Sequence, residues 1–534
     1  MSGAGAWRRV LLAAELAAGL ASGVGAGVAV AGPPGAGIAG EERRKVTMKT
    51  PDAVQEEGGI AMTLLPVPSS PLVTFRMQFR TGAIDDPEDL HGLGAVTALT
   101  IGEGGTKELT RRQVIDRLYP MAATLTVQPD REVTTFIGQV HRDHAAGFYR
   151  VLTGLLLTPR FDENDFRRSR DLLIASIETG LRGTDDEELG KEALNGFLYL
   201  GHPYGRPVIG TVQGLRTIAL EDVKTHWARH YTKGNLLAGL AGGYASGLPG
   251  TIREDFGTLP AGVTPLPALP PPPRIEGMEL YFVEKATPTA AIAIGAPLRL
   301  TRADRDFCAL MVANSWLGEH RTFNGRLMNV MRAARGLNYG DYSYIETFIQ
   351  DGGSNFPLAG IPRRQQTFSI WIRPVSRANA PFALRQAVRE LRRLVEHGLT
   401  KEEFEATRAF LLNYSRLWTQ SLGRRLGAMM DARFYGMPPL ADRMQEALPG
   451  LTVEEVNAVV KMYLDPSRLR VAIVAEGARG LVQQMLSSGP TPITYQTPTT
   501  DALLLAEDRE IEVFPLGINQ EQVRIYPAET MFEE

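Results

Sequence analysis

The sequence predicts an α+β protein made of two homologous domains, each a mainly antiparallel sheet packed with helices. Strand-like and helical patterns occur in the same order on both sides of a proline-rich stretch at residues 259–275. Contiguous prolines favour extended polyproline II and cannot join a packed core, so this stretch is read as a linker. The chain also has 534 residues, which is too many for one hydrophobic core.

The closing units of the two halves resemble each other directly. "LEDVKTHWARHYTKGNLLAGLAGG" begins at Leu220, and "VEEVNAVVKMYLDPSRLRVAIVAEG" begins at Val453. Each has an acidic helix start, a tyrosine near the helix end, a short turn and an apolar strand. The pair indicates an internal duplication with a period of about half the chain, far longer than a solenoid repeat.

These patterns divide the whole chain into segments. The predicted segments are a signal peptide (1–31), a linker (32–58), an N-terminal domain (59–256), a proline-rich linker (257–276), a C-terminal domain (277–500) and a C-terminal extension (501–534). In the extension, "EIEVFPLGI" predicts an added strand, and the residues around it either extend a partner interface or fray.

Hydrophobic periodicity predicts the elements inside each domain. The N-terminal domain should contain two strands around the turn "PSSP", a hairpin at 122–140, a last strand at 235–243, and helices at 90–101, 110–119, 142–157, 163–181, 187–199 and 219–230. The C-terminal domain should contain strands at 278–285, 289–298, 338–347, 365–375 and 468–477, and helices at 303–317, 323–334, 380–397, 401–420, 422–435 and from 452.

Composition excludes several classes of function. The formal net charge of −3 gives no basic field for nucleic acid, and 44% hydrophobic with 22% charged residues is ordinary for a soluble globular protein. Cys308 is the only cysteine, which excludes an internal disulfide and a cysteine-based zinc site.

The N-terminus resembles an export signal. Trp7-Arg8-Arg9 precedes a long Ala/Gly-rich apolar run, and Ala29-Val30-Ala31 supplies the small residues that signal peptidase cleaves after. Glu15 interrupts the run and, with the weak hydrophobicity of Ala and Gly, counts against stable membrane insertion. We expect an exported, periplasmic protein, and a cytoplasmic location remains the alternative.

Four stretches together resemble peptidase family M16, the insulinase and mitochondrial-processing-peptidase group. They are "RTGAIDDPEDLHGLG", "GHPYGRPVIGT", "HYTKGNLLAGLAG" and "RGLNYGDYS", and the resemblance covers about residues 46–500. It implies two domains of the LuxS/metallohydrolase-like fold. Active members carry His-x-x-Glu-His on one helix, where two histidines bind zinc and the glutamate takes a proton from the metal-bound water.

In this sequence the residues of the zinc site are missing. When Gly92-Leu93-Gly94 fixes the register, Ala95 and Leu99 stand at the two histidine positions, and Ala98 stands at the glutamate position. The family's third ligand follows 77 residues later and falls on Ser176. Ala and Leu offer no zinc ligand, and the only acid close to Ser176, Glu178, lies about 200° round a helix from it. We therefore expect no metal and no catalytic residue in this chain.

Other histidines and acids do not replace the missing ligands. His91 is interpreted as a helix-start residue and Glu103 as a loop residue, because they lie more than three helical turns apart. The pairs His226/His230 and His141/His144 have spacings that could bind a metal, but such pairs are more often capping or solvated histidines.

The C-terminal half keeps a second family pattern, R-x-x-x-G-L-x-Y, as Arg332 to Tyr339. The resemblance implies that Arg332 and Tyr339 bind substrate by hydrogen bonding its backbone near the scissile carbonyl. The alternative is a surface arginine and a tyrosine whose ring packs against a strand.

The resemblance then implies a division of labour, because some bacterial members split the peptidase between two chains. This chain is predicted to be the non-catalytic, substrate-binding subunit, and a zinc-bearing His-x-x-Glu-His subunit is the expected partner, with peptides or unfolded protein segments as substrate. The alternative is a structural or binding protein of M16 origin with no peptidase role. A chain that is active through unrecognised ligands has little support in the sequence.

Overall fold

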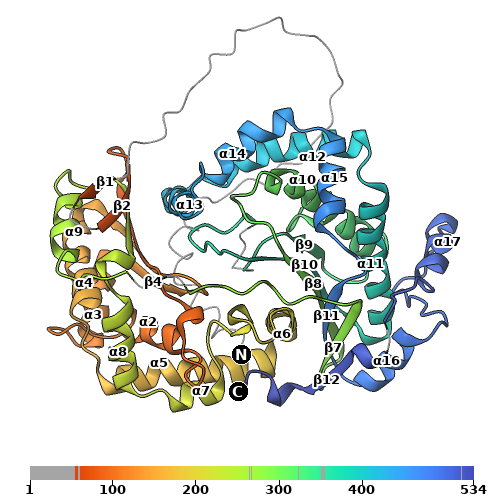
Figure 1. The fold of residues 1–534 in the computed structure, drawn as a ribbon, viewed down its shortest axis with the longest axis horizontal. Helices are drawn as coiled ribbons and strands as arrows, with labels where there is room; N and C mark the ends of the chain where they lie inside the picture. Colours follow the sequence, from red (N-terminus) through yellow and green to blue (C-terminus); the bar gives the residue numbers. More distant parts are fainter. Residues whose placement is uncertain are drawn as a thin grey trace, which may run out of the picture.

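Two six-stranded sheets organise the chain (Figure 1). The structure is a computed structural model that describes residues 55–57, 60–263, 265, 267–322, 324–349, 355–518 and 520–534. The predicted signal peptide (1–31) lies outside these residues. Of the predicted linker 32–58, only 55–57 are described, and they form a strand rather than a linker.

The N-terminal half contains the first sheet, with strand order β1-β2-β6-β3-β5-β4. Its strands are β1 (Gln55–Glu57), β2 (Ile60–Pro66), β3 (Leu72–Phe79), β4 (Thr124–Pro129), β5 (Thr134–His141) and β6 (Leu236–Gly242). Its helices are α2 (Leu93–Gly102), α3 (Arg111–Leu118), α4 (Ala145–Leu157), α5 (Glu163–Ala175), α6 (Asp186–Leu198), α7 (Val212–Thr217), α8 (Leu220–His230) and α9 (Leu248–Phe256). A π-helical segment, Ser176–Thr184, continues α5.

The C-terminal half contains the second sheet, with strand order β12-β7-β11-β8-β10-β9. Its strands are β7 (Met278–Glu284), β8 (Thr289–Leu298), β9 (Asp341–Tyr344), β10 (Gln366–Ser376), β11 (Leu469–Ala475) and β12 (Val523–Pro527). Its helices are α10 (Phe307–Gly318), α11 (Ala380–His397), α12 (Lys401–Tyr414), α13 (Leu422–Tyr435), α14 (Leu440–Ala447), α15 (Val453–Tyr463), α16 (Ala478–Leu486) and α17 (Ala502–Ile511). A π-helical turn, Met328–Ala333, precedes β9.

Apart from one edge strand, the two sheets correspond strand by strand. In each, the last strand of the repeat (β6 or β11) lies between the first two, running parallel to the first and antiparallel to the second. The duplicated α+β fold that the sequence predicted is therefore confirmed in its topology. The outer edge strand breaks the correspondence, because β1 precedes its sheet in the chain and pairs antiparallel, whereas β12 follows its sheet and pairs parallel.

The halves exchange one helix each, which the sequence analysis did not anticipate. α6 of the N-terminal half packs on β8 and β11, and its buried Leu189, Ala193 and Leu194 share a hydrophobic cluster with the C-terminal sheet. α13 of the C-terminal half packs on β2, β3 and β6 through Leu426 and Met430. Figure 1 shows α6 beside the C-terminal sheet and α13 beside the N-terminal one. Each half thus buries a sheet face that it could not cover alone.

The C-terminal extension is ordered across both halves. The prediction of an added strand at 510–518 is wrong. α17 runs to Ile511, and the strand that the extension adds is β12 at Val523–Pro527. Fraying is also contradicted: after β12 joins the C-terminal sheet, the last residues cross to the N-terminal half. There the amides of Val212 and Gln213 donate to the carbonyls of Phe532 and Glu533.

Several element boundaries differ from the predicted ones. The helix expected at 163–181 changes from α to π at Ser176, and the helix expected at 323–334 is mostly a π-helical turn. The helix expected at 401–420 ends at Tyr414. Five helices were not predicted: α7, α9, α14, α16 and α17. Apart from α17, each is a short helix of six to nine residues, too few for a clear apolar period.

Candidate functional site

The resemblance places the first two expected zinc-ligand positions on α2. This helix begins after Gly92, whose φ of 104° is open to glycine and strained for other residues. The Asp86 carboxylate accepts hydrogen bonds from the amides of Gly92 (2.7 Å) and Gly94 (2.8 Å) and so satisfies the helix start. Burial raises the pKa of Asp86 to about 7, although these two amide bonds and Arg206 act to lower it. His91 lies directly before this start, as predicted.

All three motif positions on α2 are inside the N-terminal core. Ala95, Ala98 and Leu99 are 2%, 0% and 1% exposed and belong to the cluster that contains Val127 and Phe136. Every residue of the helix is buried, so no side chain on it is available to a solvent-filled metal site. These residues do not fit a zinc ion, because none of them carries a donor atom and the space around them is filled by hydrocarbon.

Ser176 lies at the start of the π-helical segment and is 5% exposed. It lines a cavity of about 460 Å³ between the two halves. Glu178 takes no part in this cavity: its carboxylate pairs with Arg216 at 2.8 Å and lines a different hollow. The acid nearest to the third-ligand position in the sequence therefore does not stand in for it.

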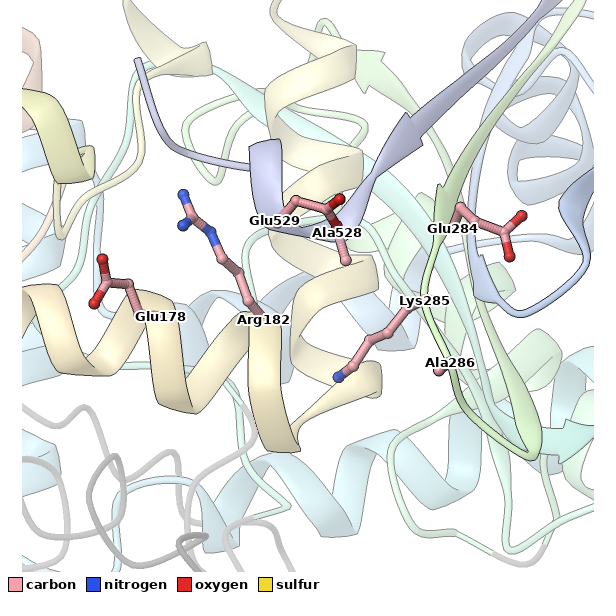
Figure 2. Close-up of a pocket in the computed structure, with 7 residues that line it drawn as sticks. All are labelled: Glu178, Arg182, Glu284, Lys285, Ala286, Ala528 and Glu529. Carbon is pink, nitrogen blue, oxygen red and sulfur yellow. The ribbon is translucent and has the colours of Figure 1, made fainter.

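Glu178 lines a hollow of about 450 Å³ where the two halves meet. Figure 2 shows Glu178 and Arg182 on one helix, Ala528 and Glu529 on a segment above them, and Glu284, Lys285 and Ala286 opposite, at the end of β7 and just after it. Arg182 donates to the Met531 carbonyl and to Glu533, and Lys285 pairs with Asp186. These pairs join the two halves, so we interpret this hollow as part of the structural contact between them.

Charged side chains from both halves line the 460 Å³ cavity, and sequence analysis did not identify it. Arg363 of the C-terminal half forms a bidentate pair with Asp130, with nitrogen–oxygen distances of 2.8 and 2.5 Å. The ammonium of Lys191 lies 2.9 Å from Glu187 and 4.2 Å from the centre of the Trp371 ring. No motif marks these residues, because they come from distant parts of the chain and Arg363 meets Asp130 only when the two halves pack together.

Arg332 and Tyr339, the predicted substrate-binding residues, lie close together. The guanidinium carbon of Arg332 is 5.5 Å from the centre of the Tyr339 ring, within the range of a cation–π contact. Tyr339 is 76% exposed, so its ring does not pack against a strand. Neither residue lines the cavity between the halves. Tyr339 therefore lies on the surface of the C-terminal half, and Arg332 beside it is half-buried.

The loop that carries the pair is held from both ends. At its start, the amides of Gly336 and Leu337 donate to the carbonyls of Arg332 and Met331, and Gly336 has a φ of 62°. At its end, the Asn338 amide group donates to Asp341 (2.7 Å) and to the Arg373 carbonyl (2.9 Å). The backbone between Arg332 and Tyr339 is therefore held in place by hydrogen bonds at both ends.

The histidine pairs do not form a metal site with other ligands. His226 and His230 on α8 are both buried, with ring centres 4.4 Å apart, and burial lowers the pKa of His226 to about 3. Within the described residues, no group of three His, Cys, Asp or Glu side chains is placed to hold a metal ion. A search of the same residues for helices of membrane-spanning length and hydropathy found none.

The comparisons with known proteins point to one family. A family model described as the peptidase M16 inactive domain matches residues 217–411. A Helicobacter pylori protein named "Non-peptidase homolog YmxG" is 23% identical over 416 residues, which cover 76% of this chain and 89% of that protein. An uncharacterized zinc protease of Bacillus subtilis is 20% identical over 407 residues, which cover 76% of this chain and 93% of that protein.

Solved structures share the fold. The peptidase M16 inactive domain from Pseudomonas fluorescens superposes with a TM-score of 0.68 at 19% identity, covering 78% of this chain and 96% of that one. A protease from Helicobacter pylori superposes with a TM-score of 0.67 at 15% identity, covering 78% and 97%. The family match over residues 217–411, the relatives and the doubled sheet order make the chain similar to the peptidase M16 family, and the solved structures show that it shares their fold.

Proposed function

We propose that this chain is the non-catalytic, substrate-binding subunit of a two-chain M16 zinc endopeptidase. One observation carries the proposal. The C-terminal half places the half-buried Arg332 of the π-helical turn beside the exposed Tyr339, while Ala95, Ala98 and Leu99 of the N-terminal half are apolar core residues. The partner would contribute the zinc and the residue that activates water, and this chain would contribute hydrogen-bond donors to the enclosed peptide.

The chemistry of the pair suits this task. The Arg332 guanidinium has several N–H donors in a fixed plane, and the Tyr339 phenol has one O–H donor. Both can donate to backbone carbonyl oxygens of a peptide, including the one that gains negative charge when water attacks it. A donor set that is exposed on one subunit and has no metal of its own fits a site completed by a second subunit.

The test uses Arg332→Ala and Tyr339→Phe, each mixed with a zinc-bearing M16 chain from the same source. Gel filtration measures association, and a quenched fluorescent peptide measures turnover. Loss of one oxyanion donor costs on the order of 10²–10³ in rate, about 3–4 kcal/mol, so turnover should fall by that factor while association stays intact. Tyr119→Phe is the control for a tyrosine that is also exposed, at 86%, but lies in the N-terminal half.

Two outcomes would reject the proposal. Unchanged turnover in both variants would show that the pair does not act on substrate, and absence of association with any zinc-bearing chain would favour a structural or binding protein without a peptidase role. About one tightly held zinc per isolated chain, measured by elemental analysis, would instead show that the chain carries a metal site of its own.

We further propose that the protein acts after export, in the periplasm. The support is the sequence of residues 1–31, with a basic start, an apolar run and Ala29-Val30-Ala31. N-terminal sequencing of the protein from its native source should begin after Ala31. A chain that begins at Met1 or Ser2 would place it in the cytoplasm.

A further inference from the structure

Arg335 lies between Arg332 and Tyr339 in the sequence but points away from the surface. Its side chain is completely buried and makes three hydrogen bonds of 2.8 Å. They go to the Val330 carbonyl in the π-helical turn, to the Asp508 carboxylate and to the Glu507 carboxylate. One guanidinium thus joins the turn that carries Arg332 to helix α17 of the C-terminal extension.

The two carboxylates are themselves fixed on α17. Glu507 also accepts a 2.9 Å bond from Arg389 of α11, and Asp508 accepts a 2.6 Å bond from the Tyr495 hydroxyl. Burial raises the pKa of Glu507, but hydrogen bonds from Arg335 and Arg389 lower it by more, so its pKa lies below its ordinary value. Figure 1 shows α17 at the outer edge of the molecule, on the same side as α11, which it contacts.

This arrangement stiffens the turn. Its last carbonyls have lost their regular helical partners: the Leu337 amide donates to the Met331 carbonyl and Arg335 itself to the Val330 carbonyl. A guanidinium with a rigid fork geometry fixes direction as well as distance, so moving α17 or removing its charges would move the turn.

We propose that Arg335, through Glu507 and Asp508 of α17, is a positioning residue that sets the placement of Arg332 and Tyr339. The proposal rests on the proposed function for its effect on turnover. It assigns a role to the C-terminal extension: α17 is the brace of the substrate-binding loop. Arg335 itself has no access to substrate, because none of its side chain reaches the surface.

The first experiment measures turnover in the two-chain mixture with the double variant Glu507→Gln/Asp508→Asn. These changes keep side-chain size and remove both charges that face Arg335. A misplacement of about 1 Å can cost on the order of 10²-fold in rate, so kcat should fall by about 10- to 100-fold with KM nearly unchanged. Glu510→Gln is the matched control, since Glu510 is on the same helix and bonds Arg389 but not Arg335.

A double-mutant cycle separates positioning from a general loss of folded protein. In a Tyr339→Phe background, Glu507→Gln/Asp508→Asn should reduce kcat by much less than in the wild-type background, because the two changes damage the same interaction. Equal reductions in both backgrounds would overturn the proposal. If the double variant does not fold, Arg335→Lys replaces it, because lysine keeps the charge but cannot reach three acceptors in a plane.

The second experiment needs no partner. Hydrogen–deuterium exchange of the isolated full-length chain follows the peptide that covers residues 328–340. Exchange at the Gly336 and Leu337 amides should become about 10-fold faster in Glu507→Gln/Asp508→Asn and stay unchanged in Glu510→Gln. Unchanged exchange in the double variant would reject the brace. If the wild-type mixture has no peptidase activity, the proposed function fails, and the exchange result alone still decides whether α17 positions the loop.

Discussion

The two halves have the same sheet order but present different residues at their functional surfaces. In the N-terminal half, the helix that should carry zinc ligands is buried along its whole length, and Ala95, Ala98 and Leu99 pack in the core. In the C-terminal half, the π-helical turn after α10 carries the half-buried Arg332, and the loop that follows carries the exposed Tyr339. The comparison shows that the zinc-site positions are not needed for the fold, since alanine and leucine fill them with continuous packing.

The largest expected effect comes from restoring the motif that the N-terminal half lacks. Ala98 is 0% exposed and packs in an apolar cluster, so Ala98→Glu alone would bury a carboxylate among hydrocarbon side chains. This change should lower the free energy of unfolding by more than about 4 kcal/mol. Adding Ala95→His, Leu99→His and Ser176→Glu should therefore not yield a stable zinc protein. Urea unfolding and elemental zinc analysis test this.

The control for this graft is Ala146→Glu in the first turn of α4. Ala146 is exposed, and an acid near a helix start is tolerated or slightly favourable, so the change should stay within about 0.5 kcal/mol. A zinc-loaded and folded quadruple variant would show that the N-terminal half still has room for the site.

A medium effect is expected where the halves meet. Burial alone lowers the pKa of the Arg363 guanidinium, but the Asp130 carboxylate raises it by more, so the guanidinium stays protonated. Asp130→Asn leaves the buried guanidinium without its counter-charge and should cost about 3 kcal/mol or more, as for other broken buried pairs. Asp116→Asn, in an exposed pair with Arg112, should cost no more than about 0.5 kcal/mol. Equal effects of the two changes in urea unfolding would show that the Asp130–Arg363 pair does not stabilise the contact between the halves.

The smallest expected effect concerns the two aligned closing helices. Thr452 caps α15 by accepting from the Glu455 amide, whereas Ala219 precedes α8 in nearly the same backbone conformation with no side-chain cap. Thr452→Ala should therefore destabilise the protein by about 1 kcal/mol, and Ala219→Thr should stabilise it by about 0.5 kcal/mol. Thermal unfolding of both variants measures whether the repeats respond in opposite directions, and a stabilised Thr452→Ala variant would contradict the comparison.

Much of the fold followed from local patterns. Apart from β1 and β12, the strands were predicted, as were most of the longer helices, because their apolar residues recur at regular spacing, and the repeat was visible at Leu220 and Val453. The exchange of α6 and α13 was not predictable, because an amphipathic helix does not encode which sheet it covers. The cavity beside Ser176 depends on that exchange, so it was missed for the same reason.

At the candidate site, the sequence identified which residues would be placed together but not what supports them. The resemblance to the family pattern R-x-x-x-G-L-x-Y led us to expect Arg332 and Tyr339 as a pair. Nothing in the sequence singled out Arg335, since its partners Glu507 and Asp508 lie about 170 residues away, in the extension. Contacts over such separations arise from tertiary packing, and no local period or cap signals them.

The chain end that crosses between the halves also bears on how the protein folds. Arg182 bonds the carbonyl of Met531, 349 residues further along the chain, and β12 supplies the edge of a sheet whose first strand begins at Met278. Contacts this distant carry a large loop-closure cost and slow folding. During synthesis the edge of β7 lacks its β12 partner, and Arg182 lacks the Met531 carbonyl, until residues 523–531 have been made. We therefore expect newly made chains to need protection from aggregation until that segment has been synthesised.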